Sequence, residues 1–360
     1  MSPIVFYVSG HGLGHATRDA ALIAALAARC PDWRFVVRTS APAHIFELEG
    51  HPVGDVQPIE TDTGVVQIDS LHLDEDETAR RAAAFYGDFA RRASDEAAVL
   101  RRLRARLVLG DIPPLAFEAA ARAGVPSVAI GNFTWDWIYA AYPSFPSIAP
   151  GVIDLVGRAY AQATHALRLP LHGGFETMCP VLEDIPFIAR RSTRGRDEAR
   201  RLLGVPLDRL VVLASFGGYD LALPYEAIAS SDDFTLLTPA RGLALGLRHQ
   251  DLVAAADVVV SKPGYGIVSE CLANETALLY TSRGRFAEYD VFVGHMPQLL
   301  RCRYCPQEDL LAGRWTPHVH ALVAQAAPTG RPRLDGAAVA AERIARWYGG
   351  IGESGNRVIG

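Results

Sequence analysis

Short apolar runs alternate with segments of helical spacing along the first half of the chain. Apolar runs predict strands at residues 4–9, 34–39, 106–111, 126–131 and 164–171. Apolar residues at helical spacing predict helices at 14–29, 77–105 and 113–124, the last ending at Gly124. Strands that alternate with helices in this way indicate a parallel sheet with helices on both faces.

The same alternation restarts after a less regular stretch that contains Pro180 and Pro186. Strands are predicted at 210–218, 234–239, 276–282 and within 256–266, and helices at 264–273, 306–312, 317–326 and 335–348. We therefore predict an α/β fold of two Rossmann-like, doubly wound domains, 1–190 and 191–350, facing a cleft. The final helix could pack back on the first domain, and residues 351–360 are expected to form a mobile tail.

Composition narrows the class of protein. The chain has 360 residues, enough for two domains, and 49% of them are hydrophobic and 21% charged, as in soluble globular proteins. A net charge of −5 without a long basic run argues against nucleic-acid binding. No apolar stretch approaches the ~18 residues of a membrane span, and no secretory signal pattern opens the chain. We therefore expect a cytoplasmic protein.

The five cysteines do not indicate a disulfide framework, because their number is odd and their spacing irregular. Cys302 and Cys305 form a CxxC pair, but no second pair accompanies it. A zinc site needs about four such ligands. These two residues are interpreted as ordinary thiols near a strand.

The stretch "SGHGLGHATR" (9–18) follows the first predicted strand and opens the first helix. Its glycines alternate as GxGxG, whereas a dinucleotide fingerprint requires GxGxxG. The second strand ends in "RTS" and lacks the acidic residue that would hold a ribose. Two independent observations, the glycine spacing and the missing acidic residue, therefore argue against a nicotinamide or flavin site.

The glycines of this stretch would still let the backbone approach an anion at a helix N-terminus. His11 and His15 add side chains that exchange protons near neutral pH. A simple glycine turn with two exposed histidines is the alternative interpretation.

A matching stretch, "SKPGYGIVSE" (261–270), follows a predicted strand in the second half. Lys262 is the only lysine in the sequence, and arginine supplies the other 34 of 35 basic residues. A compact ammonium at a strand end suits a phosphate, although a single lysine could also arise by chance. Glu270 lies about two helical turns further, where a carboxylate could bind both hydroxyls of a ribose or form a solvated helix charge.

These two stretches resemble the GT-B glycosyltransferases. Within that group they resemble the branch that contains the peptidoglycan GlcNAc transferase, the enzyme that makes lipid II. The nearest resemblance is to the N-terminal, glycosyltransferase-like half of plant L-arabinokinase. It rests on "SGHGLGHATR", "GNFTWDWIY", "EDIPFIARRSTRGRDEARRLLGV", "SKPGYGIVSECLA" and "EDLLAGRW", which together span residues 9–315. The sugar kinase half of the plant protein has no counterpart in these stretches, so no kinase activity is expected.

The resemblance implies a nucleoside diphosphate sugar as co-substrate, with UDP as the expected nucleotide, and no other cofactor. The residues implied for the donor are Gly12, Gly14, Gly217, Gly218, Lys262, Gly264, Tyr265, Gly266, Ser269, Glu270, Glu288 and Asp290. Glu270 would hold the ribose, and Glu288 and Asp290 would lie near the donor sugar. The Glu/Asp-Gln pair common there in the family is absent, which leaves the donor sugar open.

His15 is the candidate base, and Asp136 could act as a base or orient His15. The acceptor is expected to be a small hydroxylated molecule contacting His11, Asn132, Trp135 and Trp137, since aromatic faces beside a carboxylate suit a sugar. Either tryptophan could instead belong to the core. Lys262 and backbone N–H groups would balance the leaving diphosphate, so no metal is expected.

Two other functions fit the same residues. The protein could bind a nucleotide sugar without turnover, as a sensor or as a regulator of a separate kinase. It could also epimerise or hydrolyse a nucleotide sugar on the same fold. Inversion or retention at the sugar and the oligomeric state are not indicated by the sequence.

Overall fold

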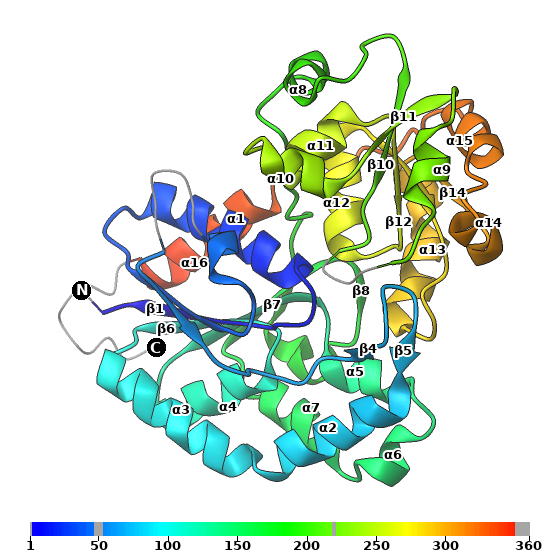
Figure 1. Cartoon of the computed structure of the whole chain (residues 1–360). Coiled ribbons are helices and arrows are strands. Elements are labelled where there is room, and N and C mark those ends of the chain that lie inside the picture. The colour runs from blue at the N-terminus through cyan, green and yellow to red at the C-terminus, as the bar shows by residue number, and fades with distance from the viewer. Residues whose placement is uncertain (1, 47–52, 218–220, 350–360) are drawn as a thin grey trace.

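A computed structural model describes residues 2–46, 53–217 and 221–349. Seven parallel strands form the first sheet, in the order β3-β2-β1-β6-β7-β8-β9 (Figure 1). The strands are β1 (Ile4–Val8), β2 (Phe35–Thr39), β3 (Asp55–Pro58), β6 (Leu107–Asp111), β7 (Ser127–Phe133), β8 (His165–Gly173) and β9 (Leu182–Asp184). A small antiparallel pair, β4 (Val66–Gln67) and β5 (Leu73–Asp74), lies outside this sheet.

Helices cover both faces of the first sheet. The side chains of β1 alternate between the two faces, and every residue of β1 is buried because both faces are covered. Ile4 and Phe6 point into a core with α1 and α16, and Val5 and Tyr7 point into a second core with the helices from α2 to α7. The helices are α1 (Gly14–Arg29), α2 (Glu75–Gly87), α3 (Phe89–Leu103), α4 (Pro114–Ala123), α5 (Trp135–Ala140), α6 (Phe145–Ile148), α7 (Val152–Tyr160) and α16 (Gly336–Tyr348), with the short turns η1 (Ala43–Phe46) and η2 (Glu176–Val181).

The prediction of one long helix over 77–105 is wrong. The segment forms α2 and α3, which meet at Asp88. Gly87 lowers the helix propensity there, and Asp88 leaves helical geometry at φ −106° and ψ 13°. The carboxylate of Asp88 then accepts hydrogen bonds from Arg91 in the first turn of α3.

Five parallel strands form the second sheet, in the order β11-β10-β12-β13-β14. They are β10 (Leu210–Ala214), β11 (Phe234–Leu237), β12 (Val258–Ser261), β13 (Ala277–Tyr280) and β14 (Cys302–Tyr304). The accompanying helices are α8 (Arg196–Leu203), α9 (Tyr225–Ala229), α10 (Pro239–Ala244), α11 (His249–Ala255), α12 (Tyr265–Asn274), α13 (Ala287–Leu299), α14 (Gln307–Leu311) and α15 (Thr316–Val323).

Two elements connect the halves of the molecule. Helix α16, at the end of the described chain, packs on α1 beside the first sheet (Figure 1). Its Trp347 stacks on His165 of β8 with ring centroids 4.0 Å apart. Helix α13, from the second half, also packs on β8. The predicted tail at 351–360 lies outside the described residues.

Both sheets direct the carboxyl ends of their central strands toward the space between the halves. The turn from β1 to α1 faces the turn from β12 to α12, and a Cβ added to Gly266 would lie 3.6 Å from Cα of Gly14. The two glycine-rich turns are therefore in close contact. Within the described ranges, no helix is both long and apolar enough to cross a membrane.

Candidate functional site

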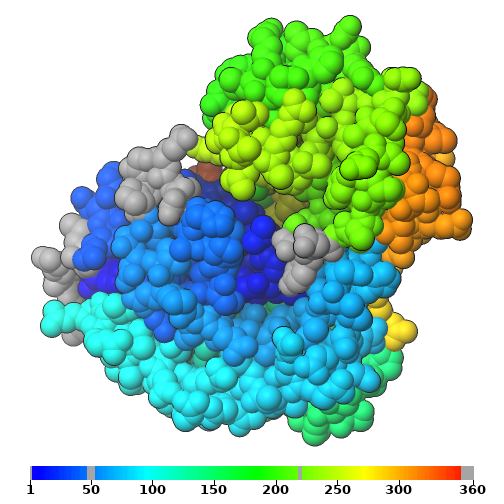
Figure 2. All heavy atoms as spheres, viewed as in Figure 1, coloured from blue at the N-terminus to red at the C-terminus, as the bar shows by residue number. Residues whose placement is uncertain are grey.

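A cavity of about 340 Å³ lies between the two sheets, at the ends of β1, β7, β10 and β12. Figure 2 shows the molecule hollowed between its blue and its yellow-green parts. Twelve of the residues predicted for the site line this cavity: His11, Gly12, Gly14, His15, Asn132, Gly217, Lys262, Gly264, Tyr265, Gly266, Glu270 and Glu288. Glycine-rich turns and polar strand ends thus meet at one place.

Five predicted site residues do not line the cavity: Trp135, Asp136, Trp137, Ser269 and Asp290. Ser269 is buried, and its hydroxyl donates a hydrogen bond to the carbonyl of Gly266, 3.0 Å away, one turn earlier in α12. It therefore stabilises the first turn of this helix. Asp290 is exposed on α13. Gly218 lies outside the described residues.

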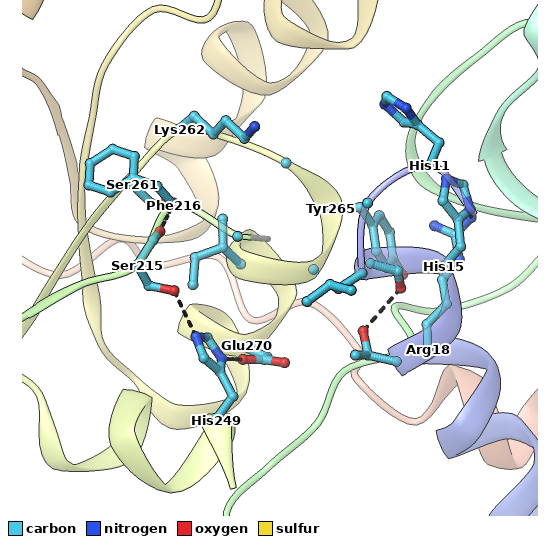
Figure 3. Close-up of a pocket in the computed structure, with 18 of the residues that line it drawn as sticks. His11, His15, Arg18, Ser215, Phe216, His249, Ser261, Lys262, Tyr265 and Glu270 are labelled. Atoms are coloured by element: carbon cyan, nitrogen blue, oxygen red, sulfur yellow. Dashed lines mark hydrogen bonds and ion pairs between the residues drawn. The ribbon is translucent and has the colours of Figure 1, made fainter. Parts of the chain in front are cut away.

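His15 is the second residue of α1 and is buried at the first-sheet side of the cavity (Figure 3). Its Nδ1 lies 2.9 Å from Oδ1 of Asp111, the last residue of β6. The β1–β6 register places Asp111 beside Val8, the last residue of β1. The carboxylate therefore lies next to the β1–α1 turn, which leads to His15. Asp111 was not among the predicted site residues. The signal that could have identified it is its position as an acidic residue at the end of an apolar strand.

Arg18 fixes the charge of Asp111. Its Nε lies 2.5 Å from Oδ2, and its Nη2 also contacts Oδ1. Burial alone would raise the pKa of Asp111, but Arg18 and His15 lower it below its usual range. Asp111 is therefore a carboxylate, which can only accept hydrogen bonds, so His15 carries its proton on Nδ1. Arg18 Nη2 is 3.0 Å from Nδ1 but is a donor itself, so these two atoms do not bond to each other.

The prediction that Asp136 orients His15 is therefore wrong, because Asp111 holds that position. Asp136 faces α7 instead, with Oδ2 3.6 Å from the point that a Cβ on Gly157 would occupy. Trp137 lies against Gly173 of β8. Both side chains therefore pack on neighbouring elements, Asp136 on α7 and Trp137 on β8, and neither lines the cavity.

Trp135 belongs to the core and supports His11 from behind. Its side chain is fully buried, and its Nε1 donates to Oδ2 of Asp62, 2.9 Å away. The rings of Trp135 and His11 meet edge to face at 5.3 Å, and the other side of His11 stacks on Phe286 at 5.9 Å. Burial, followed by the nearby His15 and Arg283, lowers the pKa of His11 well below its usual value. His11 is thus a neutral, rigidly held ring in the cavity wall.

Lys262 stands at the second-sheet side, at the end of β12 (Figure 3). Its Nζ donates to Oε1 of Gln67 from the first half, 3.0 Å away. Burial and the neighbouring Arg283 lower the pKa of Lys262 to about 7. The first turn of α12 follows immediately, so its free N–H groups and the Lys262 amine lie on the same wall.

Glu270 lines the cavity, but both of its oxygens have partners. Oε1 accepts from Nε of Arg190 at 2.7 Å and also contacts Nη2, and Oε2 lies 2.6 Å from Nδ1 of His249. Burial opposes ionisation, yet His249 and Arg190 lower the pKa of Glu270. The expected contact to both ribose hydroxyls would have to share these oxygens with two protein partners.

Glu288 and Asn132 join the two halves beside the cavity. Asn132 Nδ2 donates to Oε1 of Glu288 at 2.6 Å, and Asn132 Oδ1 accepts from Arg18 Nη1 at 2.7 Å. Burial raises the pKa of Glu288. This chain of contacts continues through Arg18 to Asp111 and His15, so the predicted base is connected to helix α13.

Several cavity residues had no signal in the sequence: Arg18, Arg190, Ser215, Phe216, His249, Arg283 and Phe286. Arg18 stood inside the quoted glycine-rich stretch but was given no role. Arg190 and His249 lie in a connector and at a helix start, and only the folded chain brings them to Glu270.

Comparison with known proteins places the fold. No family model matches the chain. Solved structures that resemble it include CalG4, the calicheamicin glycosyltransferase (TM-score 0.61, 16% identity, 97% of this chain and 99% of that one). The fold is that of the GT-B glycosyltransferases. MurG of Acinetobacter baumannii (TM-score 0.51, 11% identity, 96% and 99%) shares it, as does a protein assigned as a UDP-N-acetylglucosamine 2-epimerase from Listeria monocytogenes (TM-score 0.56, 14% identity, 100% of both chains).

One curated relative is similar in sequence to this chain. L-arabinokinase of Arabidopsis thaliana is 31% identical over 337 residues, which cover 88% of this chain. The chain spans about a third of that relative's length, since the match covers 32% of it. The solved structures confirm the predicted GT-B fold, whereas the branch within the GT-B proteins stays a prediction.

Proposed function

We propose that the protein transfers a sugar from a nucleoside diphosphate, with UDP as the expected nucleotide, to an acceptor hydroxyl. One observation carries the proposal: His15, oriented by Asp111, faces the α12 turn and Lys262 across a single cavity. A candidate base and a candidate diphosphate site then lie on opposite walls, with room between them for the reacting groups. The GT-B fold supports this interpretation.

The tautomer of His15 determines its chemistry. With its proton on Nδ1, the ring leaves Nε2 with a free lone pair that can accept a proton. Nε2 would take the acceptor hydroxyl proton as the acceptor oxygen bonds to the anomeric carbon. The bond from that carbon to the diphosphate oxygen breaks, and the diphosphate leaves with the electron pair. A positioned base of this kind contributes about 10²–10⁴ in rate.

The leaving diphosphate would be balanced by groups of the second half. The N–H groups at the start of α12 and the ammonium of Lys262 lie on one wall and would meet the developing negative charge. Gly217, at φ +83°, lets the β10 loop approach the same space without a side chain. Because these groups supply the positive charge, the proposal requires no metal.

The acceptor would bind on the first-half wall. That wall presents His11, Asn132 and Phe133, whereas Trp135 and Trp137 lie outside it. A neutral imidazole, an amide and a phenyl ring suit a small hydroxylated acceptor better than a charged one.

The test is the variant His15→Ala, assayed for nucleoside diphosphate release from UDP-sugars with a panel of hydroxylated acceptors and EDTA present. We expect turnover to fall by about 10²–10⁴ while the Kd for UDP stays within a factor of about two. His320→Ala is the matched control, since His320 lies half exposed on α15 and is absent from the cavity lining. Retained turnover in His15→Ala would remove His15 as the base.

A second candidate function is epimerisation or hydrolysis of the nucleotide sugar. It is favoured by the full-length structural match to the protein assigned as a UDP-N-acetylglucosamine 2-epimerase. Product analysis without an acceptor separates the two functions. A converted or hydrolysed sugar at the rate seen with acceptors supports the second candidate, and strict dependence on an acceptor supports transfer.

A further inference from the structure

Ser215, His249 and Glu270 form a continuous hydrogen-bonded chain in the second-half wall (Figure 3). Ser215 Oγ lies 2.9 Å from Nε2 of His249, and Nδ1 of His249 lies 2.6 Å from Oε2 of Glu270. Ser215 directly follows β10, and its carbonyl accepts a hydrogen bond from Ser261 at the end of β12. The Ser215 hydroxyl is therefore positioned between the two strand ends that border the cavity.

The positions of the protons in this chain follow from the charge of Glu270. Its Oε1 accepts a hydrogen bond from Nε of Arg190 at 2.7 Å, and this cation favours the ionised form in spite of burial, so Glu270 is a carboxylate and only accepts. His249 must then carry a proton on Nδ1. While His249 is neutral, its Nε2 is an acceptor, and Ser215 must donate its hydroxyl proton to it.

This arrangement is unfavourable for an anion. With its proton directed at His249, the Ser215 oxygen presents only lone pairs to the cavity, and these repel a phosphate oxygen. When His249 gains a second proton, Nε2–H donates to Ser215 instead. The hydroxyl proton is then free to turn toward the cavity and donate to an anion.

We propose that His249 is a positioning residue for the donor diphosphate, which binds together with one proton that His249 takes up from solvent. Ser215 then turns its hydroxyl proton from His249 to a phosphate oxygen. This inference rests on the proposed function, because it assigns the diphosphate to the β10–β12 side of the same cavity. Binding of the diphosphate and protonation of His249 are then reciprocally linked.

The same residue types in this order form the nucleophile of serine hydrolases, where the serine N–H often helps to stabilise an oxyanion. Here the Ser215 N–H already donates to the carbonyl of Val260 at 3.0 Å. The geometry therefore favours an oriented hydroxyl donor over a nucleophile.

The charged groups around His249 come from several elements. Glu270 of α12 bonds to it, and Arg190 faces the opposite oxygen of Glu270. On its own helix, Asp251 is held by Ser192 and by the backbone N–H of Arg248. Lys262 also borders the cavity and can take up a proton itself, but its contribution is common to the wild type and to variants of Ser215 and His249.

The experiment measures UDP binding by calorimetry from about pH 6 to about pH 8.5 in buffers of different ionisation enthalpy. We expect Ser215→Ala to weaken binding by about tenfold to a hundredfold at the low end, where the hydroxyl donates to the diphosphate. At the high end the variant and the wild type should converge, because the hydroxyl proton is then directed at His249. His249→Gln should bind UDP with about one proton less uptake than the wild type. His320→Gln should match the wild type.

Two results would overturn the inference alone: UDP affinity in Ser215→Ala with the same pH dependence as the wild type, or unchanged proton uptake in His249→Gln. The first would mean that His249 acts only through its charge. Failure of the wild type to bind any nucleoside diphosphate would instead overturn the proposed function, and the inference with it. Circular dichroism of each variant establishes that it is folded.

Discussion

At the scale of single residues, the function of His15 depends on the carboxylate behind it. Asp111 holds the proton of His15 on Nδ1 and leaves Nε2 free, whereas an asparagine could also donate and would permit the other tautomer. We expect Asp111→Asn to lower kcat by about 10²–10⁴ with little change in the Kd for UDP. Steady-state kinetics and calorimetry measure the two quantities.

Asp136→Asn is the matched control for this variant, because Asp136 lies outside the cavity lining. It should leave kcat unchanged, and a comparable loss in both variants would contradict the assignment of Asp111. Asp111→Asn also leaves the buried Arg18 without its ion pair, which costs about 3–5 kcal/mol of stability in comparable cases. Activity must therefore be measured at a temperature where the variant is folded.

The lowered pKa of Lys262 predicts that the free energy of unfolding depends on pH. The pKa of its amine is about 7 in the folded protein, owing to burial and Arg283, and about 10.4 in the unfolded chain. Between these values the unfolded state binds more protons, so the unfolding free energy of the wild type rises with pH relative to Lys262→Met. Chemical denaturation at several pH values measures this difference. Parallel stability curves for the two proteins would contradict the lowered pKa.

The sequence indicated some site residues and not others, for a physical reason. His15 and Lys262 stand in glycine-rich turns at strand ends, and such turns carry a local signal for anion binding. Asp111 and His249 have no such signal, because strand order and helix packing bring them to their partners. The two tryptophans were misplaced because composition does not reveal which face of a short helix points inward.

At the scale of elements, periodicity predicted most strands of the two sheets to within a few residues. It did not resolve α5 to α7 in the aromatic segment 135–160, because α5 and α6 have only 6 and 4 residues and Pro143 and Pro146 interrupt the helical spacing. It also joined α2 and α3, because Gly87 and Asp88 interrupt the helix without disturbing the apolar spacing.

Helix α16 begins at Gly336, and its start is packed against the backbone of the segment that follows β9. A Cβ at Gly336 would lie 2.2 Å from the carbonyl oxygen of Pro186 and 2.7 Å from the carbonyl carbon of Phe187. Gly336→Ala is therefore expected to lower the unfolding free energy by about 1–3 kcal/mol. Gly294→Ala is the control: it lies exposed inside α13 with nothing within 4 Å and should raise stability by about 0.5–1 kcal/mol. Equal effects at both positions, measured by urea unfolding, would contradict the packing described.

At the scale of the whole molecule, the cavity exists because the two sheets face each other and remain connected. One apolar core runs from α1 and α16 to the helices α11 and α12 of the second half. Polar contacts such as Asn132–Glu288 and Lys262–Gln67 cross the cavity rim. The glycine-rich turns of both halves are held together in this way around the proposed donor and acceptor sites.

We propose that this cavity binds a nucleoside diphosphate and its sugar. The most direct measurement is the thermal stability of the protein with UDP, GDP, ADP, dTDP and NADH in turn. We expect stabilisation by one or more nucleoside diphosphates, of about 2.7 kcal/mol at a hundredfold excess over Kd, and none by NADH. Stabilisation by NADH alone, or by none of the five compounds, would contradict it.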